Sequence, residues 1–102
     1  MQQVKLVSAD EKLLISLAGE IDAATSEEFY AQVCAMYEHD KKDLVFDCAA
    51  LEFIDSTTLG TFVKLFKKVK ADEFAFKLIN VRPRIKKLFE ICALDRLMEI
   101  EG

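Results

Sequence analysis

Two hydrophobic periodicities, one typical of strands and one typical of helices, take turns along the chain. Two short apolar runs, residues 3–7 and 13–19, flank the polar segment SADEK and predict a β-hairpin. Beyond residue 20, helix-like and strand-like segments alternate without internal repeats or low-complexity linkers. This alternation is typical of an α/β domain in which helices join parallel strands, and the opening hairpin would make its sheet mixed.

Three segments carry apolar residues at the spacing of an amphipathic helix. The first spans residues 25–38, where Thr25 and Glu28 are expected to form a capping box. The second helix includes Thr57 onward, and the third begins at Pro83, which suits the first turn of a helix. The apolar residues of the three stripes are Phe29, Val33, Met36 and Tyr37, then Leu59, Phe62, Val63, Phe66 and Val69, then Ile85, Leu88, Phe89 and Cys92.

Two further runs, residues 43–49 and 74–81, are rich in the β-branched and aromatic residues of strands. The run at 43–49 lies between two expected helices, so we expect it to be parallel to a neighbouring strand. The last residues, 96–102, fit no single pattern. We therefore predict one α/β domain over residues 1–102, with a mixed sheet of four to five strands and helices packed mainly on one face.

The charge balance favours a protein partner over a nucleic acid. The 102 residues hold 14 Lys and Arg against 18 Asp and Glu, a formal net charge of −4, whereas binding to phosphate backbones depends on excess positive charge. No cationic leader is recognised at the start, and no uncharged run approaches the roughly 18 residues of a membrane span. We expect a cytoplasmic protein with no nucleic-acid binding and no membrane insertion.

The cysteines and the single histidine offer little chemistry. Cys34, Cys48 and Cys92 share no short spacing and lie in apolar stretches, so we expect three small core residues rather than disulfides or metal ligands. His39 lies in the charged segment EHDKK, which is typical of a solvated loop. No Gly-x-Ser-x-Gly motif or phosphate-binding glycine loop occurs. The sequence therefore predicts no enzyme, no catalytic residue, no metal and no cofactor.

Residues 53–60, FIDSTTLG, carry the most informative polar residues of the chain. Ser56 stands where a strand becomes a helix, so its side chain is expected to cap that helix, a role that requires no function. Thr57 and Thr58 cannot both cap as well, and Gly60 costs about 1 kcal/mol relative to alanine within a helix. A second interpretation therefore stays open, in which the small residues leave this corner accessible to a partner or to a modification.

The chain resembles the STAS-domain anti-sigma factor antagonists of bacteria. The segment LVFDCAALEFIDSTTLG is similar to the central family motif, in which a strand ends in Asp-Ser-Ser/Thr-Gly-Leu-Gly. The segments LAGEIDAATSEEF and KLINVRPRIKKLFEICALD are similar to two flanking family segments and occur in the same order. The matching residues of the first two segments are Asp47, Phe53, Ile54, Asp55, Ser56, Thr57, Leu59 and Gly60, then Gly19, Glu20 and Asp22.

The resemblance implies a STAS-like fold and a function in partner switching. It makes Ser56 the phosphoacceptor of a partner that is both an anti-sigma factor and a serine kinase of the GHKL type. The unphosphorylated form would bind this partner and release the sigma factor, and a phosphoserine phosphatase would reset the switch. The expected partner contact combines acids of two loops with the polar face of the second helix: Glu20, Asp22, Asp55, Ser56, Thr57, Thr58, Gly60, Thr61 and Lys64.

One position departs from the family pattern, and one alternative remains open. Thr58 stands where the family usually has glycine, which adds a β-branched side chain beside Ser56 and leaves open which hydroxyl is modified. STAS domains also serve as accessory or scaffold subunits, for example of lipid-transport complexes. In that alternative the segment 53–60 would dock a partner without being phosphorylated.

Overall fold

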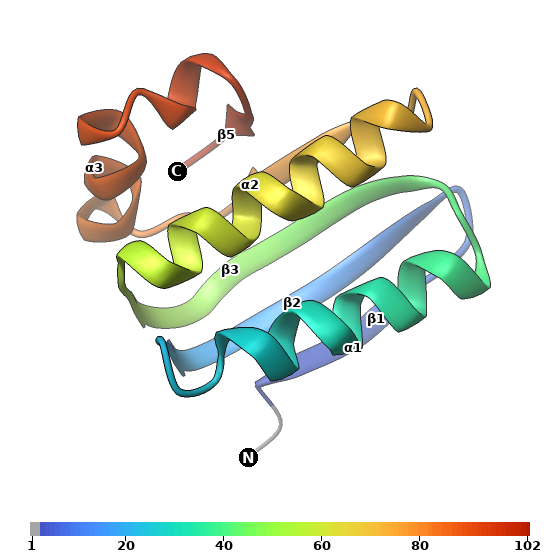
Figure 1. Cartoon of the computed structure of the whole chain (residues 1–102), viewed down its shortest axis with the longest axis horizontal. Coiled ribbons are helices and arrows are strands. Elements are labelled where there is room, and N and C mark those ends of the chain that lie inside the picture. The colour runs from blue at the N-terminus through green and yellow to red at the C-terminus, as the bar shows by residue number, and fades with distance from the viewer. Residues whose placement is uncertain (1–2) are drawn as a thin grey trace.

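The computed structural model describes residues 3–102 and has a five-stranded sheet with three α-helices (Figure 1). The strands lie in the order β1-β2-β3-β4-β5, with β1 antiparallel to β2 and every other neighbouring pair parallel. The mixed sheet, the hairpin and the parallel third strand predicted from the sequence are thus confirmed. The elements are β1 (Val4–Ser8), β2 (Lys12–Ile21), α1 (Ser26–His39), β3 (Asp43–Ile54), α2 (Ser56–Ala71), β4 (Phe76–Ile79), α3 (Pro83–Ile91), the 3₁₀ turn η1 (Leu94–Arg96) and β5 (Glu99–Ile100).

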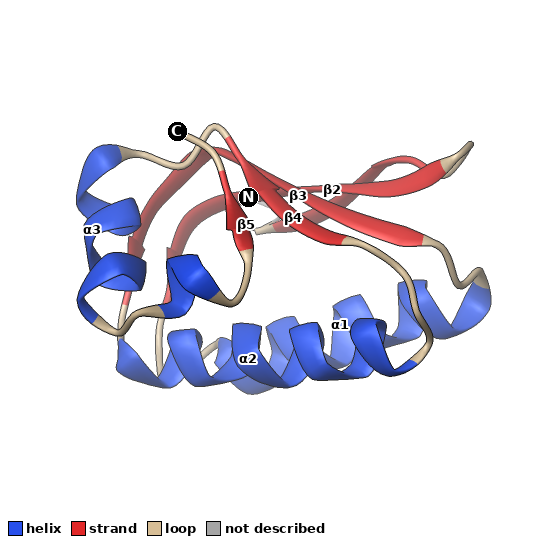
Figure 2. Ribbon diagram, turned by 90° about the horizontal axis from the view of Figure 1, so that it is seen from above, coloured by secondary structure: helices blue, strands red, loops and turns tan. Residues whose placement is uncertain are grey.

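The helices α1 and α2 lie side by side under one face of the sheet, and α3 lies at one end of it (Figure 2). The alternation in β2 explains this layering, because Leu13, Ile15 and Leu17 are buried while the residues between them are half-exposed. Since β2 and β3 are parallel, their carboxyl ends meet at the same edge, with Ile21 opposite Ile54. The loop after β2 and the junction after β3 are therefore neighbours.

Aromatic side chains fill the space between the sheet and the helices. The ring of Phe62 lies 5.3 Å from that of Phe29, 5.5 Å from that of Phe46 and 5.6 Å from that of Phe89, measured between centroids. Phe62 has no exposed surface. Because these four rings come from α1, β3, α2 and α3, the packing of Phe62 joins all three helices to the sheet.

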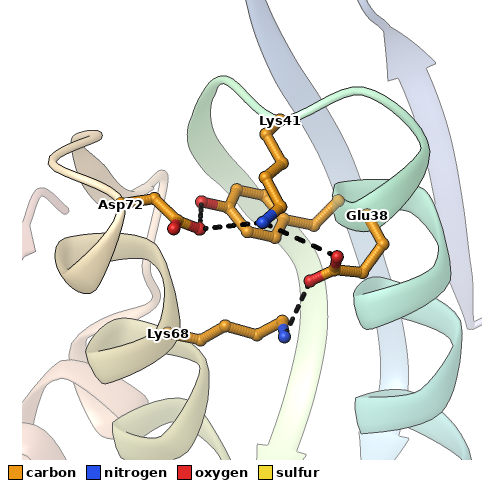
Figure 3. A network of polar contacts seen from close by, with 5 residues as sticks. Glu38, Lys41, Lys68 and Asp72 are labelled. Atoms are coloured by element: carbon orange, nitrogen blue, oxygen red, sulfur yellow. Dashed lines mark hydrogen bonds and ion pairs between the residues drawn. The ribbon is translucent and has the colours of Figure 1, made fainter.

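A polar network joins the carboxyl ends of α1 and α2 (Figure 3). The buried Tyr37 donates its hydroxyl hydrogen to Asp72 at 2.6 Å, and Lys68 pairs with Glu38 at 2.7 Å. Burial raises the pKa of Tyr37, and its hydrogen bond lowers the pKa of the Asp72 carboxyl. The two helices are thus tied together at the end that lies away from Ser56.

Several element bounds and burial assignments differ from the sequence predictions. β3 runs to residue 54 instead of 49, and β4 covers only 76–79 instead of 74–81. On α2, Val63 is half-exposed and Leu65 takes its place in the core. The expectation of three core cysteines is wrong, because only Cys48 is buried, while Cys34 is half-buried and Cys92, just past the end of α3, is exposed.

The longest described helix, α2, has 16 residues. Across residues 3–102, none of the helices combines the length and the apolar character needed to cross a bilayer.

Candidate functional site

Asp55, and not Ser56, caps helix α2. Its backbone is extended, and its carboxylate accepts a hydrogen bond from the amide of Thr58 at 3.0 Å. Ser56 is the first residue of the helix and is exposed. The prediction that Ser56 caps the helix is therefore wrong by one residue, since the cap is the last residue with non-helical backbone. The hydroxyl of Ser56 is consequently not required for the structure of this helix end.

Asp55 also holds the loop that follows β2. The second oxygen of its carboxylate accepts a hydrogen bond from the backbone amide of Ala23 at 2.9 Å. The amide of Thr58 is the main cause, and the amide of Ala23 a further cause, of a pKa of the Asp55 carboxyl below its ordinary value. One ionised carboxylate thus fixes two segments that are 32 residues apart in the sequence.

Beneath this carboxylate, Ser26 and Thr58 form a buried pair of hydroxyls. Their oxygens lie 2.9 Å apart, and the two residues are 3% and 0% exposed. Thr58 also donates to the carbonyl of Ile21 at 2.6 Å, and Ser26 donates to the carbonyl of Asp22 at 2.7 Å. Each hydroxyl has only one hydrogen to donate. The hydrogens that Thr58 and Ser26 donate to the two carbonyls are therefore also the only ones available for the contact between the two hydroxyls. The pair joins the first turns of α1 and α2 to the end of β2.

The expected capping box of α1 is not formed. Thr25 stands at the cap position, but its side chain makes no capping bond to the helix. Its hydroxyl oxygen instead accepts a hydrogen bond from the backbone amide of Asp22 at 3.0 Å. The carboxylate of Asp22 in turn accepts from the amide of Ala24 at 3.0 Å, so the loop 22–25 is closed by its own side chains.

We expect Thr58→Val to destabilise the protein by about 2 kcal/mol, because valine keeps the shape but leaves buried polar partners unpaired. The carbonyl of Ile21 and the hydroxyl of Ser26 would each lose a hydrogen-bond partner. Urea denaturation measures this free energy. The matched control is Thr57→Val, which changes an exposed neighbour in the same way and should shift the midpoint little. Equal midpoints for the two variants would contradict the role given to the buried pair.

Most residues of the expected partner contact gather on one exposed corner. We call it the Ser56 face. One expected member, Thr58, does not belong to it because it is fully buried, and another, Thr61, is only 7% exposed. Thr58 belongs to the buried stripe of α2. Thr61 lines the hollow between α1 and α2 beside this face, and its hydroxyl donates to the carbonyl of Thr57 at 3.2 Å. The Ser56 face comprises Glu20, Asp22, Asp55, Ser56, Thr57, Gly60 and Lys64, all exposed or half-exposed.

A polar hollow of about 290 Å³ adjoins the Ser56 face between α1 and α2. Its lining includes Glu27, Tyr30, Thr57 and Lys64, and the ammonium of Lys64 lies 5.8 Å from the ring centroid of Tyr30. Ser26, Glu27 and Tyr30 were not predicted as part of this region. The only signal in the sequence was their place in the first turns of a helix that follows the acidic loop.

The single histidine of the sequence does not lie at this corner. His39, the only histidine, lies in the last turn of α1, whereas Ser56 lies at the start of α2. The two helices are joined at their carboxyl ends by the Tyr37–Asp72 bond, so the histidine is at the other end of the helix layer. Within residues 3–102 no cluster of His, Cys, Asp or Glu is arranged to hold a metal ion.

The model of the STAS domain family matches residues 3–102. The anti-sigma-B factor antagonist of Staphylococcus aureus (strain NCTC 8325 / PS 47) is 27% identical over 97 residues, which cover 95% of this chain and 90% of that protein. An anti-sigma factor antagonist from Mycobacterium paratuberculosis has a similar structure, with a TM-score of 0.87, 22% identity and coverage of 97% and 84% of the two chains. The Bacillus protein SpoIIAA in its phosphorylated form superposes with a TM-score of 0.71 at 24% identity, covering 98% of this chain and 90% of that one.

Proposed function

Because the chain belongs to the STAS-domain family, and its relatives include anti-sigma factor antagonists, we propose that it is an anti-sigma factor antagonist switched by phosphorylation of Ser56. The unphosphorylated form binds an anti-sigma factor that is also a serine kinase of the GHKL type, and thereby releases a sigma factor. The phosphorylated form does not bind. A phosphoserine phosphatase restores the binding form.

The observation that carries this proposal is the position of Ser56 in the structure. It is exposed and opens α2, while the capping bond that the helix end needs is made by Asp55. A phosphate at this position lies at the positive end of the helix dipole, which stabilises it by about 0.3–1 kcal/mol. Modification is therefore compatible with the folded protein, and its effect is confined to whatever binds at this corner.

Gly60 supports a docking role for the same face. It lies one helical turn after Ser56, and a Cβ added there would meet no atom within 4 Å beyond its chain neighbours and the backbone of its own helix. Internal packing therefore does not require a glycine, although glycine weakens a helix by about 1 kcal/mol relative to alanine. Close approach of another protein surface explains why this position lacks a side chain.

The relatives support the same assignment. The Staphylococcus aureus relative is named as an antagonist of an anti-sigma-B factor, and SpoIIAA has been solved in a phosphorylated and in an unphosphorylated form. In this chain we place a phosphate on the serine at the start of α2. The phosphoryl chemistry belongs to the partner, since the corner provides a hydroxyl but no histidine base.

Incubation with ATP and soluble extract of the host should add one phosphate to the wild-type protein, which intact mass spectrometry detects. Ser56→Ala should prevent this addition, because it removes the exposed hydroxyl that we assign as acceptor. Thr57→Ala is the matched control, since it removes the neighbouring exposed hydroxyl, and it should still be phosphorylated. Loss of the phosphate in Thr57→Ala alone would move the acceptor to Thr57. An unmodified wild-type protein that still binds its partner would favour a constitutive accessory subunit.

A further inference from the structure

The Ser56 face lacks one component that stable protein interfaces require. Its members are acids, hydroxyl residues, a glycine and a lysine, without any large apolar side chain. The centre of a specific interface is usually apolar and contains aromatic or aliphatic anchors that fill pockets. A partner that docks over Ser56 therefore needs an apolar contact beyond this polar corner.

An exposed aromatic side chain lies three residues before Ser56. Phe53 is 44% exposed at the end of β3, although Ile54 beside it is buried. Each residue of an extended strand advances the chain by about 3.3 Å, so the backbone of Phe53 lies within roughly 10 Å of that of Ser56. The area of about 800 Å² that one partner contributes to a standard interface is wide enough to span this distance.

Phe53 borders an apolar hollow between the end of β3 and helix α3. The hollow has a volume of about 230 Å³, which is enough for one large side chain. Its apolar lining comes from Phe53, Ile54, Ile85 and Leu88, and two charged residues, Glu52 and Arg84, complete it. The outer face of α3 continues this surface, because Arg84, Leu88 and Ile91 follow one another at helical spacing and Ile91 is 70% exposed.

The charges around the two parts of this surface differ, because the Ser56 face is mainly acidic whereas the hollow is lined by one acid, Glu52, and one base, Arg84. Asp55, Glu20 and Asp22 lie on the side of the loop after β2, whereas Arg84 and Lys87 are exposed on α3. Arg84 has no ion-pair partner among residues 3–102. An acidic group of a partner beside the hollow would therefore meet an unpaired guanidinium, for which carboxylates are the preferred ligands.

We infer that the protein that docks over Ser56 also inserts a large apolar side chain into the hollow beside Phe53 and places a carboxylate against Arg84. This inference rests on the proposed function and adds a second anchor to its contact surface. Of the other exposed large apolar residues, Leu6 and Val7 lie on β1, and Leu97 lies just before β5. Leu6 pairs with Ile15 in the half of β2 that is nearer the hairpin, away from the edge where Ser56 lies, so we expect it not to contact the same partner.

Photo-crosslinking tests whether one partner covers both anchors. The cross-linking amino acid p-benzoylphenylalanine is placed at position 53, at position 57 on the Ser56 face, or at position 6, in the full chain expressed in its host. Positions 53 and 57 should be joined to the same protein, identified by mass spectrometry, and position 6 should not. Cross-linking of that protein from position 57 but not from 53 would overturn the inference, as would the absence of any shared product.

Calorimetry with the purified partner, once cross-linking has identified it, then measures how much the contact at Phe53 contributes to the binding affinity. Phe53→Ala should raise the dissociation constant at least about tenfold, while Leu6→Ala, which truncates a side chain of similar exposure (39%), should change it less than about twofold. Arg84→Glu should weaken binding more at low salt than at high salt, and it keeps the test valid if Phe53→Ala is poorly folded. Wild-type affinity for both Phe53→Ala and Arg84→Glu would overturn the inference.

The inference and the proposed function can fail separately. If Ser56 is phosphorylated but position 53 joins no partner, the switch stands and the second anchor does not. If positions 53 and 57 join one protein but Ser56 is never phosphorylated, the docking surface stands and the phosphorylation switch does not.

Discussion

Phe62→Ala should unfold the protein or leave it severely destabilised, by about 3–5 kcal/mol, because it removes a fully buried ring. The ring contacts those of Phe29, Phe46 and Phe89, with centroids 5.3–5.6 Å away. The cavity would lie where both helices of the main layer and α3 meet the sheet, so no single element can move to fill it. Since small domains have a total stability of only about 5–15 kcal/mol, this loss would be a large part of the whole.

Urea denaturation followed by circular dichroism measures the effect. Lys64→Ala, two residues further along the same helix, is the matched control because its side chain is exposed, and it should change the free energy of unfolding by less than about 0.5 kcal/mol. Comparable losses in the two variants would mean that the buried and exposed faces of α2 are wrongly assigned.

The phase of helix α2 shows what the sequence can and cannot predict. The spacing of Leu59, Phe62, Phe66 and Val69 correctly identifies the buried stripe. It does not reveal that Thr58 and Thr61 are buried in the same stripe, because a threonine is as compatible with an exposed polar face as with a satisfied interior position. Burial of Thr58 is favourable because its hydroxyl finds partners on other elements, the carbonyl of Ile21 on β2 and the hydroxyl of Ser26 on α1.

The sequence does not identify Asp55 as the cap of α2 for a related reason. In the sequence Asp-Ser-Thr-Thr each of the four residues is a good capping residue, and the choice depends on which one keeps an extended backbone. That choice is made by the tertiary structure, because the carboxylate of Asp55 also binds the amide of Ala23 on the neighbouring loop. Bonds between segments 32 residues apart leave no periodic pattern that a single sequence would show.

The bounds of β3 and the exposure of Cys92 also depend on long-range contacts. Residues 50–54 have a weak strand pattern, but β2 pairs with them up to Ile54, across two register shifts. Cys92 continues the apolar spacing of α3, yet the helix ends at residue 91 and the side chain falls outside the core. Fold class and helix phase are thus predictable from the local sequence pattern. The residues at which strands and helices end are instead determined by the segments that pair with them or pack against them.

The capping bond of Asp55 makes the hydroxyl of Ser56 independent of the helix end. If Ser56 were the cap, its modification would disturb the helix end, and loss of binding would follow from local unfolding. Because Asp55 makes the capping bond and Thr58 joins α2 to β2 and α1 from beneath, the helix end does not depend on the Ser56 hydroxyl. A phosphate there is therefore expected to act on the partner contact without unfolding its own domain.

Phosphorylation of Ser56 should weaken binding of the anti-sigma factor at least about a hundredfold, a change of about 2.7 kcal/mol. Phosphate adds a charge of about −1.5 to −2 beside the ionised Asp55, and a partner covering both groups must remove water from them. The helix dipole stabilises the phosphate in the free protein, which further favours the unbound state. Ser56→Asp adds a smaller charge, so it should weaken binding at least about tenfold, or about 1.4 kcal/mol.

Calorimetry with the purified partner measures both affinities, and circular dichroism with urea denaturation shows whether the variants remain folded. Ser8→Asp is the matched control, since it makes the same substitution at the end of β1, where Ser8 pairs with Leu14 near the hairpin. It changes the net charge equally and should leave the affinity within about twofold of wild type. Equal weakening by Ser8→Asp and Ser56→Asp would assign the effect to net charge. Unchanged affinity of the folded phosphoprotein would remove Ser56 from the partner contact, because a dianion cannot be buried there without cost.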